Sequence, residues 1–168
     1  KSLWQNVTSH DLTNLDTSNA TSFAFFFNRN YKLTSITGVN NLNTEKVTNL
    51  EGAFFNCKAL TSLNLSNWNV AKVTRMVSTF RYMEKCTSLN VASWNVAKVT
   101  TFNYCFADMT SLKTISLSSW KPSSAEHMNS MFRNDKVLTK ITLGSSWTVS
   151  KVGDFNNMFR ECNDLTIN

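Results

Sequence analysis

Apolar residues recur along the chain with a period of about 26 residues. The clearest repeated position, which we call the anchor column, holds Leu15, Leu42, Trp68, Trp94, Trp120 and Trp147. A phenylalanine follows each anchor by twelve positions, at Phe27, Phe54, Phe80, Phe106, Phe132 and Phe159. Two of the anchors, Trp68 and Trp94, begin identical heptads with the sequence WNVAKVT. Self-similarity at a fixed period predicts a repeat architecture in which equivalent residues stack from unit to unit.

A short helix is predicted in the first half of each unit. In the third unit, Val73, Met76 and Phe80 are spaced i, i+3 and i+7, which would place them on one face of a helix. Thr74 lies at the start of this segment, where its hydroxyl is expected to cap free backbone N–H groups. Because the other units repeat the pattern, the sequence predicts one short helix per unit.

A short strand is predicted in the second half of each unit. Leu60, Leu63 and Leu65 form the pattern L-x-x-L-x-L, which is typical of leucine-rich repeats and of a strand with one buried side. Equivalent strands are expected near residues 33–39, 89–91, 112–117 and 138–143. The predicted fold class is therefore an α/β repeat solenoid. It would be a right-handed leucine-rich-repeat coil with one short parallel strand and one short helix per unit of about 26 residues.

The chain of 168 residues is expected to form a single domain. Residues 1–14 fit the repeat poorly and are interpreted as an N-terminal cap, and residues 15–168 as a six-unit solenoid. Trp4 and the Phe25–Phe27 cluster are expected to seal the first unit. Since the chain starts and stops within a pattern, we expect it to be a fragment of a longer protein.

Three motifs carry a resemblance to a known family. They are the string WNVAKVTRMVSTF, the F-x-x-C motif at Phe54–Cys57 and the L-T-S-L motif at Leu60–Leu63. The chain resembles the bacterial surface-protein 26-residue repeat family, which belongs with the BspA-like leucine-rich-repeat surface proteins, over residues of about 12–168. Leu15 and Leu42 depart from the family pattern, which has tryptophan there, and Cys86 replaces a strand leucine. The resemblance implies a secreted or wall-anchored bacterial protein that adheres to host surfaces.

Catalytic and metal-binding chemistry is not indicated by the sequence. Cys57 and Cys162 share a column but lie four units apart, roughly 19 Å if layers are spaced like strands, which is too far for a disulfide. Cys86 and Cys105 occupy other columns, so free thiols are expected. His10 and His127 fall in unrelated positions, and no converging set of acids, bases or nucleophiles is seen. We therefore predict no catalytic residues, no metal site and no cofactor, and do not expect an enzyme.

Positive charge is the most informative polar feature. Lysine and arginine number 17 against 11 acidic residues, a net charge of +6. Four lysines share the position four residues after the anchor, at Lys46, Lys72, Lys98 and Lys151. Three arginines share the position after the repeated phenylalanine, at Arg81, Arg133 and Arg160. Stacked units would turn these columns into a basic ladder that attracts anionic glycans, although the same lysines could simply keep an exposed face soluble.

The outward side of the strands is an alternative binding face. Its candidate residues are Ser62, Asn64, Ser88, Asn90, Thr114 and Ser116. They are short and polar, which suits weak, multivalent contact with sugar hydroxyls, and suits a plain solvated sheet equally well. They include no large aromatic or arginine anchor of the kind that dominates protein interfaces.

The predicted function is that of a bacterial cell-surface adhesion module. It would lie outside the cell, secreted or anchored to the wall, and bind host mucin or epithelial glycans and glycoproteins without catalysis. Teichoic acids and other anionic polymers also fit a basic ladder, whereas nucleic acid is not expected because the aromatic columns are predicted to be buried. No apolar run approaches the roughly 20 residues of a membrane helix, so membrane insertion is not expected. The alternative is a structural spacer or stalk of a wall-anchored protein, with no ligand of its own.

Overall fold

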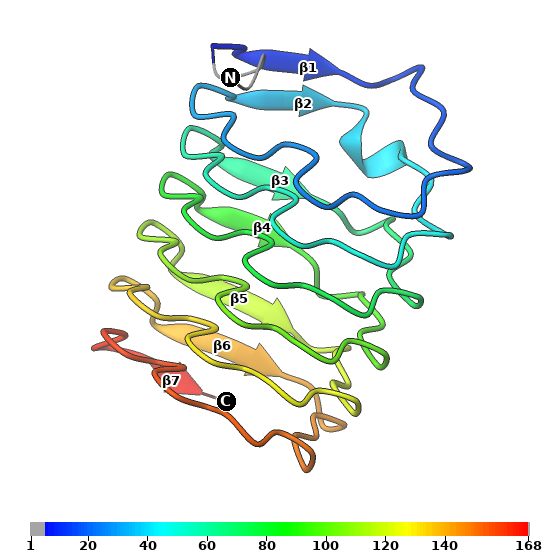
Figure 1. Cartoon of the computed structure of the whole chain (residues 1–168). Helices are drawn as coiled ribbons and strands as arrows, with labels where there is room; N and C mark the ends of the chain where they lie inside the picture. The colour runs from blue at the N-terminus through cyan, green and yellow to red at the C-terminus, as the bar shows by residue number, and fades with distance from the viewer. Residues whose placement is uncertain (1–5, 168) are drawn as a thin grey trace.

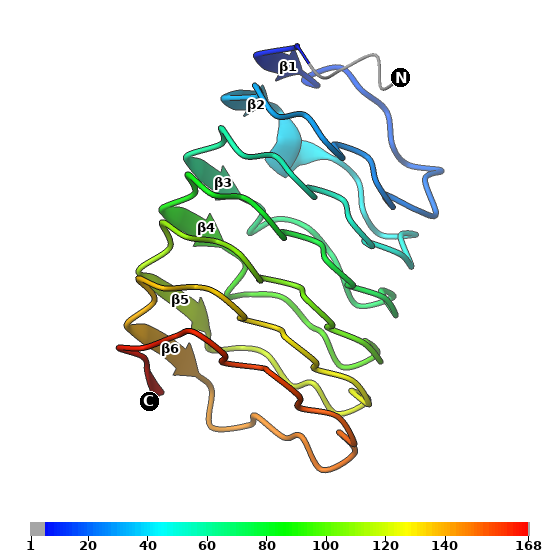
Figure 2. The same cartoon turned by 60° about the vertical axis from the view of Figure 1, so that its left-hand side comes forward.

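Each repeat unit forms one layer of a stack in the structure, a computed structural model that describes residues 6–167 (Figure 1). Short strands lie one above another along one side of the stack, and irregular turns form its other sides (Figure 2). The strands are β1 (Ser9–Asp11), β2 (Ser35–Thr37), β3 (Ser62–Asn64), β4 (Ser88–Asn90), β5 (Thr114–Leu117), β6 (Lys140–Leu143) and β7 (Thr166–Ile167). Within residues 6–167 the one helical segment is a short 3-10 helix, η1 (Val39–Asn41).

Paired strands run parallel and in register. Leu63 in β3 lies opposite Leu89 in β4, and Ile115 in β5 lies opposite Ile141 in β6. All four of these side chains are buried, whereas their strand neighbours on either side are mostly exposed. The strands therefore lie where the alternating leucine pattern predicts them.

The predicted fold class is nevertheless wrong. The described part of the chain contains no α-helix, so the expected helix of each unit is missing. The strands form three separate sheets, β1–β2, β3–β4 and β5–β6–β7, rather than one continuous sheet. The protein is nearly all-β and is not an α/β leucine-rich-repeat solenoid with one helix per unit.

The segment predicted as a helix forms a ladder with the next layer instead. The N–H groups of Met76, Ser78 and Phe80 donate to carbonyl oxygens of the following unit over 2.9–3.1 Å. In an α-helix these N–H groups would donate to the residue four positions earlier. Met76 and Phe80 are completely buried by this arrangement. The i, i+3, i+7 spacing therefore reflects burial from a series of tight turns rather than one face of a helix.

Two residues per unit have left-handed backbone conformations, which a helix does not tolerate. The column two positions before the repeated phenylalanine holds Phe25, Gly52, Ser78, Tyr104, Ser130 and Asn157, with φ of 53–58°. The column two positions after it holds Arg29, Asn56, Tyr82, Asp108, Asn134 and Glu161, with φ of 59–64°. Hydrogen bonds from Ala53 to Leu50 and from Cys57 to Phe54 close the two turns of the second unit. A positive φ at the third residue of such a turn is the mark of type II geometry.

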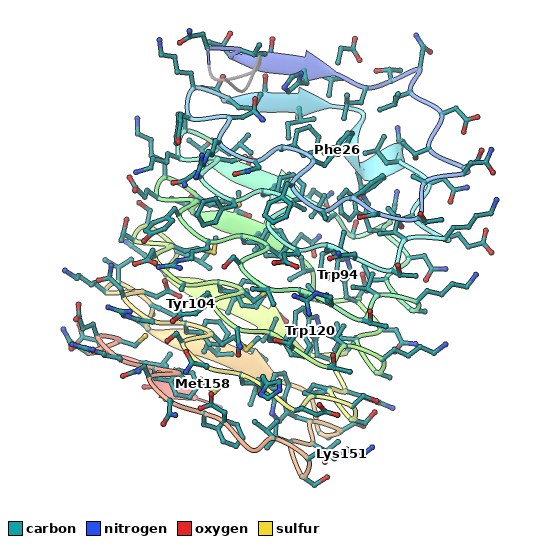
Figure 3. All side chains as sticks on the ribbon, viewed as in Figure 1. Phe26, Trp94, Tyr104, Trp120, Lys151 and Met158 are labelled. Carbon is teal, nitrogen blue, oxygen red and sulfur yellow. The ribbon has the colours of Figure 1, made fainter. Side chains whose placement is uncertain are left out.

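Rows of aromatic rings form the core, as the repeat predicts. The repeated phenylalanines stack from layer to layer with ring centroids 5.1–5.7 Å apart. Trp94 lies between Trp68 and Trp120 at 6.2 and 6.3 Å, with the rings 7° from parallel. Figure 3 shows Trp94 and Trp120 in successive layers of the stack. The Trp94 indole N–H donates to the carbonyl oxygen of Leu65 at 2.9 Å. The predicted stacking of Trp68 on Trp94 is therefore confirmed. The indole N–H groups of Trp68 and Trp120 likewise donate to backbone carbonyl oxygens, each at 2.8 Å.

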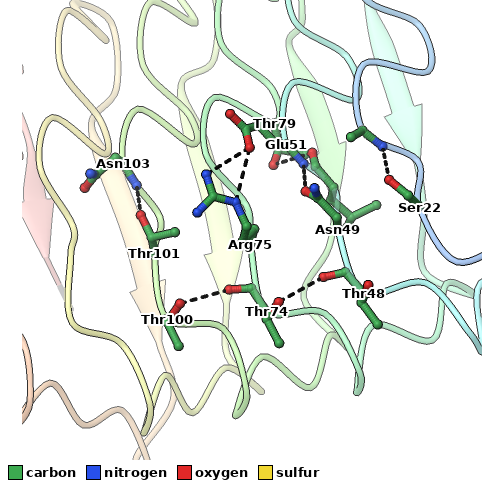
Figure 4. Close-up of polar contacts among 12 residues, drawn as sticks. Ser22, Thr48, Asn49, Glu51, Thr74, Arg75, Thr79, Thr100, Thr101 and Asn103 are labelled. Atoms are coloured by element: carbon green, nitrogen blue, oxygen red, sulfur yellow. Dashed lines mark hydrogen bonds and ion pairs between the residues drawn. The ribbon is translucent and has the colours of Figure 1, made fainter.

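Threonine hydroxyls link successive layers rather than capping helices. The hydroxyls of Thr48, Thr74 and Thr100 each donate to the carbonyl oxygen of the equivalent threonine one layer earlier, at 3.2 Å. Figure 4 shows the bonds from Thr100 to Thr74 and from Thr74 to Thr48. The predicted capping role of Thr74 is therefore wrong, because there is no helix to cap.

The described part of the predicted N-terminal cap, residues 6–14, forms part of the first layer of the stack. β1 lies within the predicted cap of residues 1–14 and pairs with β2. Phe27 is buried, whereas Phe25 and Phe26 are 52% and 39% exposed. Residues 1–5, with the Trp4 that was expected to seal the first unit, lie outside the described residues.

Candidate functional site

The four lysines of the predicted ladder are all exposed. Lys46, Lys72, Lys98 and Lys151 occupy the same position in four of the layers, and Lys151 projects from the edge of the stack (Figure 3). Lys46 Nζ donates to Asn19 Oδ1, in the layer before it, at 2.9 Å. Across residues 6–167, no ion pair involves any of the four. We call these four residues the lysine column.

Successive lysines are close enough to act on the same ligand. The rings of Trp68 and Trp94, each four residues before a lysine of the column, lie 6.2 Å apart. At this spacing between layers, the charges of lysines on adjacent layers are expected to fall within the Debye length of about 8 Å at physiological salt. Their like charges therefore reinforce one another toward an anionic polymer that runs along the stack. Ser124 interrupts the column before Lys151.

The three predicted arginines differ in what surrounds them. Arg81 Nε pairs with Asp108 Oδ2 at 2.9 Å, and only 22% of the Arg81 side chain is exposed. Arg160 is exposed and lies 3.7 Å from a carboxylate oxygen of Glu161. Arg133 is half-buried. The arginine column therefore presents less unpaired positive charge than the lysine column does.

Arg81 belongs to an aromatic cluster that the sequence did not reveal. Its guanidinium carbon lies 4.6 Å from the centre of the Tyr82 ring and 4.5 Å from that of Tyr104. One of its terminal nitrogens also donates to the Tyr82 hydroxyl at 2.9 Å. A bulky ring is unfavourable at positive φ, and both tyrosines occupy left-handed columns that otherwise hold mostly small or polar residues. These outliers in the repeat were the available signal in the sequence.

Two buried aspartates lie next to this cluster. Asp108 accepts hydrogen bonds from Arg81 and, at 2.9 Å, from Asn134 Nδ2. Asp135 is completely buried, and its Oδ1 accepts from the Met109 N–H at 2.8 Å, while its Oδ2 has no hydrogen-bond partner in the described part of the chain. Burial raises the pKa of Asp135 well above its usual value, and the charge of Asp108 adds to the rise.

The predicted strand face carries short polar side chains at regular positions. Ser62 and Asn64 lie opposite Ser88 and Asn90 in the paired strands β3 and β4, and all four are exposed. In β5, Thr114 is exposed and Ser116 is half-buried. The break between β4 and β5 places Thr114 and Ser116 on a different sheet from the other four candidate residues.

The cysteines are free thiols in the structure. Cys57, Cys86 and Cys105 are buried and Cys162 is half-buried. Burial raises the pKa of Cys57 to about 12 and that of Cys86 to about 11, so both are protonated at neutral pH. Within residues 6–167 no three histidine, cysteine or acidic side chains gather as a metal site would require. His10 lies in β1 near the Phe27 ring, whereas His127 lies five layers along the stack.

The sequence profile of one family covers the whole chain. The family is described as a Mycoplasma protein of unknown function, DUF285, and its profile matches residues 1–90 and again residues 48–168. The chain belongs to the DUF285 family. Two overlapping DUF285 matches agree with the internal repeat, because several successive units satisfy the same profile. No curated protein matches the chain in sequence. The described part of this DUF285 protein contains no helix of the length and apolarity that a membrane crossing requires.

Proposed function

We propose that this DUF285 chain is an extracellular adhesion module of a bacterial cell surface, related to the BspA-like proteins with 26-residue repeats. It binds host mucin or epithelial glycans without catalysis. The lysine column is the observation that carries the proposal, since four exposed ammonium groups recur along the stack without ion-pair partners among residues 6–167. A mucin carries many sulfated and sialylated glycans along one polypeptide, so its negative charges recur along its length and match such a row.

The energetics favour a polymeric ligand over a small one. An exposed ion pair contributes about 0–1 kcal/mol, so a single sulfate or carboxylate bound to one lysine would be held weakly. A chain that reaches several lysines gains from each contact in turn, because the later contacts form within one complex. Such binding weakens as salt screens the charges.

The test removes the charge of the lysine column and keeps the stack. We would change Lys46, Lys72, Lys98 and Lys151 to Gln and measure mucin binding between low and high salt. The matched control changes Lys32, Lys85, Lys113 and Lys121 to Gln, which are also exposed and leave the same net charge. We expect at least a tenfold loss of affinity at low salt and a flatter salt dependence for the column variant, and a much smaller change for the control.

Two results would contradict the proposal. Equal losses in the two variants would mean that net charge alone attracts mucin, and unchanged binding would reduce the lysine column to a solubilising face. A wild-type chain that fails to bind mucin or epithelial cells at all would instead favour the spacer function.

A further inference from the structure

The row of strands is interrupted between β2 and β3. Among residues 6–167, β2 pairs only with β1 and β3 only with β4, and no backbone hydrogen bond joins β2 to β3. A groove of about 350 Å³ lies at this break. Seven of its lining residues lie between positions 34 and 41 and four between positions 60 and 64. Figure 1 shows β2 and β3 on either side of the break, with η1 beside it.

The turn that borders the groove is held from both neighbouring layers. Gly38 has φ of 77°, and a Cβ at this position would lie 2.8 Å from the Thr13 backbone nitrogen. On the other side, Trp68 Nε1 donates to the Val39 carbonyl oxygen at 2.8 Å. The Asn67 N–H donates to Asn40 Oδ1 at 3.0 Å. The η1 turn is therefore fixed in place, and the groove is a built feature of the fold.

The lining of the groove is uncharged. None of its eleven residues carries a charge, so an anionic glycan finds no ion-pair partner there. Half-buried Ile36 and buried Leu63 line the groove with apolar side chains, whereas Ser35, Ser62 and Asn64 are short, polar and exposed. The facing edges of β2 and β3 bring backbone N–H and C=O groups that make no bond to each other. Donors and acceptors that alternate at strand spacing are matched by one common partner, another polypeptide backbone.

We propose that this groove binds an extended, uncharged segment of a partner protein by β-augmentation. The segment pairs with the free edges of β2 and β3, as strands add to exposed sheet edges. One aliphatic side chain of the segment lies against Ile36 and Leu63, and its neighbours in sequence face Ser35 and Ser62. This site lies apart from the lysine column and goes beyond the proposed glycan binding.

The test uses a short synthetic strand as the probe. Acetyl-Thr-Val-Thr-Val-Thr-amide is neutral and alternates polar and aliphatic side chains. We expect its titration into the ¹⁵N-labelled protein to shift amide signals of Ser35–Thr37 and Ser62–Asn64 above all others. A version of the peptide with alternate backbone nitrogens methylated keeps every side chain and loses those donors, so it should bind at least tenfold more weakly.

Two variants of the protein locate the site. Ser62→Trp fills the groove, whereas Ser88→Trp places the same side chain on the strand position directly opposite, outside the lining. Ser62→Trp should weaken peptide binding at least tenfold and Ser88→Trp should not. The proposal is overturned if the peptide fails to bind at millimolar concentration, if the methylated peptide binds equally, or if the two variants behave alike. It is also overturned if an N-acetylglucosamine trisaccharide occupies the groove and the peptide does not. The lysine-column variant should bind the peptide like the wild type, which separates this test from that of glycan binding.

Discussion

The position three residues after the repeated phenylalanine shows how strongly a layer restricts a single side chain. This column holds Asn30, Cys57, Met83, Met109, Asp135 and Cys162. Cys57 and Cys162 satisfy their thiols by donating to the carbonyl oxygens of Phe27 and Phe132. Asp135 instead leaves a carboxyl oxygen without a partner at a position where the preceding layers hold methionine. A buried, unpaired carboxylate is costly, so this residue couples the stability of the fold to pH.

Changing Asp135 to Asn should remove that coupling. Because the folded protein has the higher Asp135 pKa, the protonated form contributes stability that is complete below the ordinary pKa of about 4 and is lost as pH rises through the raised value. We expect the variant to gain stability relative to the wild type as pH increases from 3 to 8, as measured by urea unfolding at each pH.

The neighbours of Asp135 sharpen this comparison. Asp108 faces it and is itself paired with Arg81, and Cys162 lies against it from the last layer. Asp11 and Asp16 have lowered pKa values from hydrogen bonds with Thr13 and Ser18, and they act in the opposite direction, since their contribution is lost as pH falls. The wild type and Asp135→Asn share these groups, so their effects cancel in the comparison. A difference in the free energy of unfolding that stays constant across pH would contradict the prediction.

Two glycines provide a matched test of close packing between layers. A Cβ on Gly144 would overlap the backbone carbonyl of Ser118, whereas a Cβ on Gly153 would meet nothing within 4 Å. We expect Gly144→Ala to lower the free energy of unfolding by about 1–3 kcal/mol, because a backbone atom cannot move aside easily. Gly153→Ala should change it by no more than about 0.5–1 kcal/mol. Equal unfolding midpoints for the two variants in urea would show that the layers do not touch at Gly144.

The main element of the fold is the series of tight turns around the repeated phenylalanine of each unit, which we call the turn ribbon. The hydrophobic spacing of this segment predicted a helix, which is wrong. Val73, Met76 and Phe80 have helical spacing, and they are buried as a helix face would be. The spacing records which residues point inward and not which backbone bonds place them there. Gly52, Ser78 and Asn56, at the left-handed positions, are poor helix formers and were the sign that the segment turns instead. The strands were predictable because alternation of buried and exposed residues with a period of two is typical of a strand and not of a helix or a series of turns.

Substitutions at Asn56 distinguish the turn ribbon from a helix. Asn56 has φ of 62°, which glycine adopts freely and a β-branched residue does not. We expect Asn56→Val to lower the free energy of unfolding by about 1–2 kcal/mol and Asn56→Gly to change it by less than about 0.5 kcal/mol. In the interior of a helix the order is reversed, since glycine is less favourable there than valine. Thermal and urea unfolding of both variants would give the order directly.

Over the whole molecule, burial is greatest in the middle layers and falls toward the last one. Trp94 and Trp120 are at most 1% exposed, whereas Trp147 in the last unit is only half-buried and Phe155 is 43% exposed. Each layer of a repeat protein is stabilised mainly by its neighbours, so an end layer with one neighbour opens most easily.

Hydrogen exchange should follow this gradient. We expect amides of β4 and β5 to exchange slowest and those of β6 and β7 at least tenfold faster, as measured by mass spectrometry of peptic fragments. A single exchange rate for all protected amides would mean that the stack opens only as a whole.

The candidate sites differ in how far the sequence could reveal them. The lysine column follows from periodicity alone, because a repeated position becomes a row once the layers stack. The Arg81 cluster lies where two tyrosines occupy left-handed positions of the repeat. The groove between β2 and β3 is lined mainly by the unit from Leu15 to Leu42, which is one residue longer than each of the next three units. A pattern search reports what the units share, and these sites depend on how particular units differ.

Trp68 and Trp94 each begin the heptad WNVAKVT, and their rings stack in parallel. The two layers that they belong to are therefore interchangeable. Excising residues 69–94 would join Trp68 to Asn95 and leave the reading WNVAKVT intact. Such a gene would encode a shorter stack with every row still continuous, and duplication of the same stretch would encode a taller one. The number of layers can therefore change by recombination without any change in how one layer packs on the next. The length of the stack can then vary while the residues on its surface stay the same.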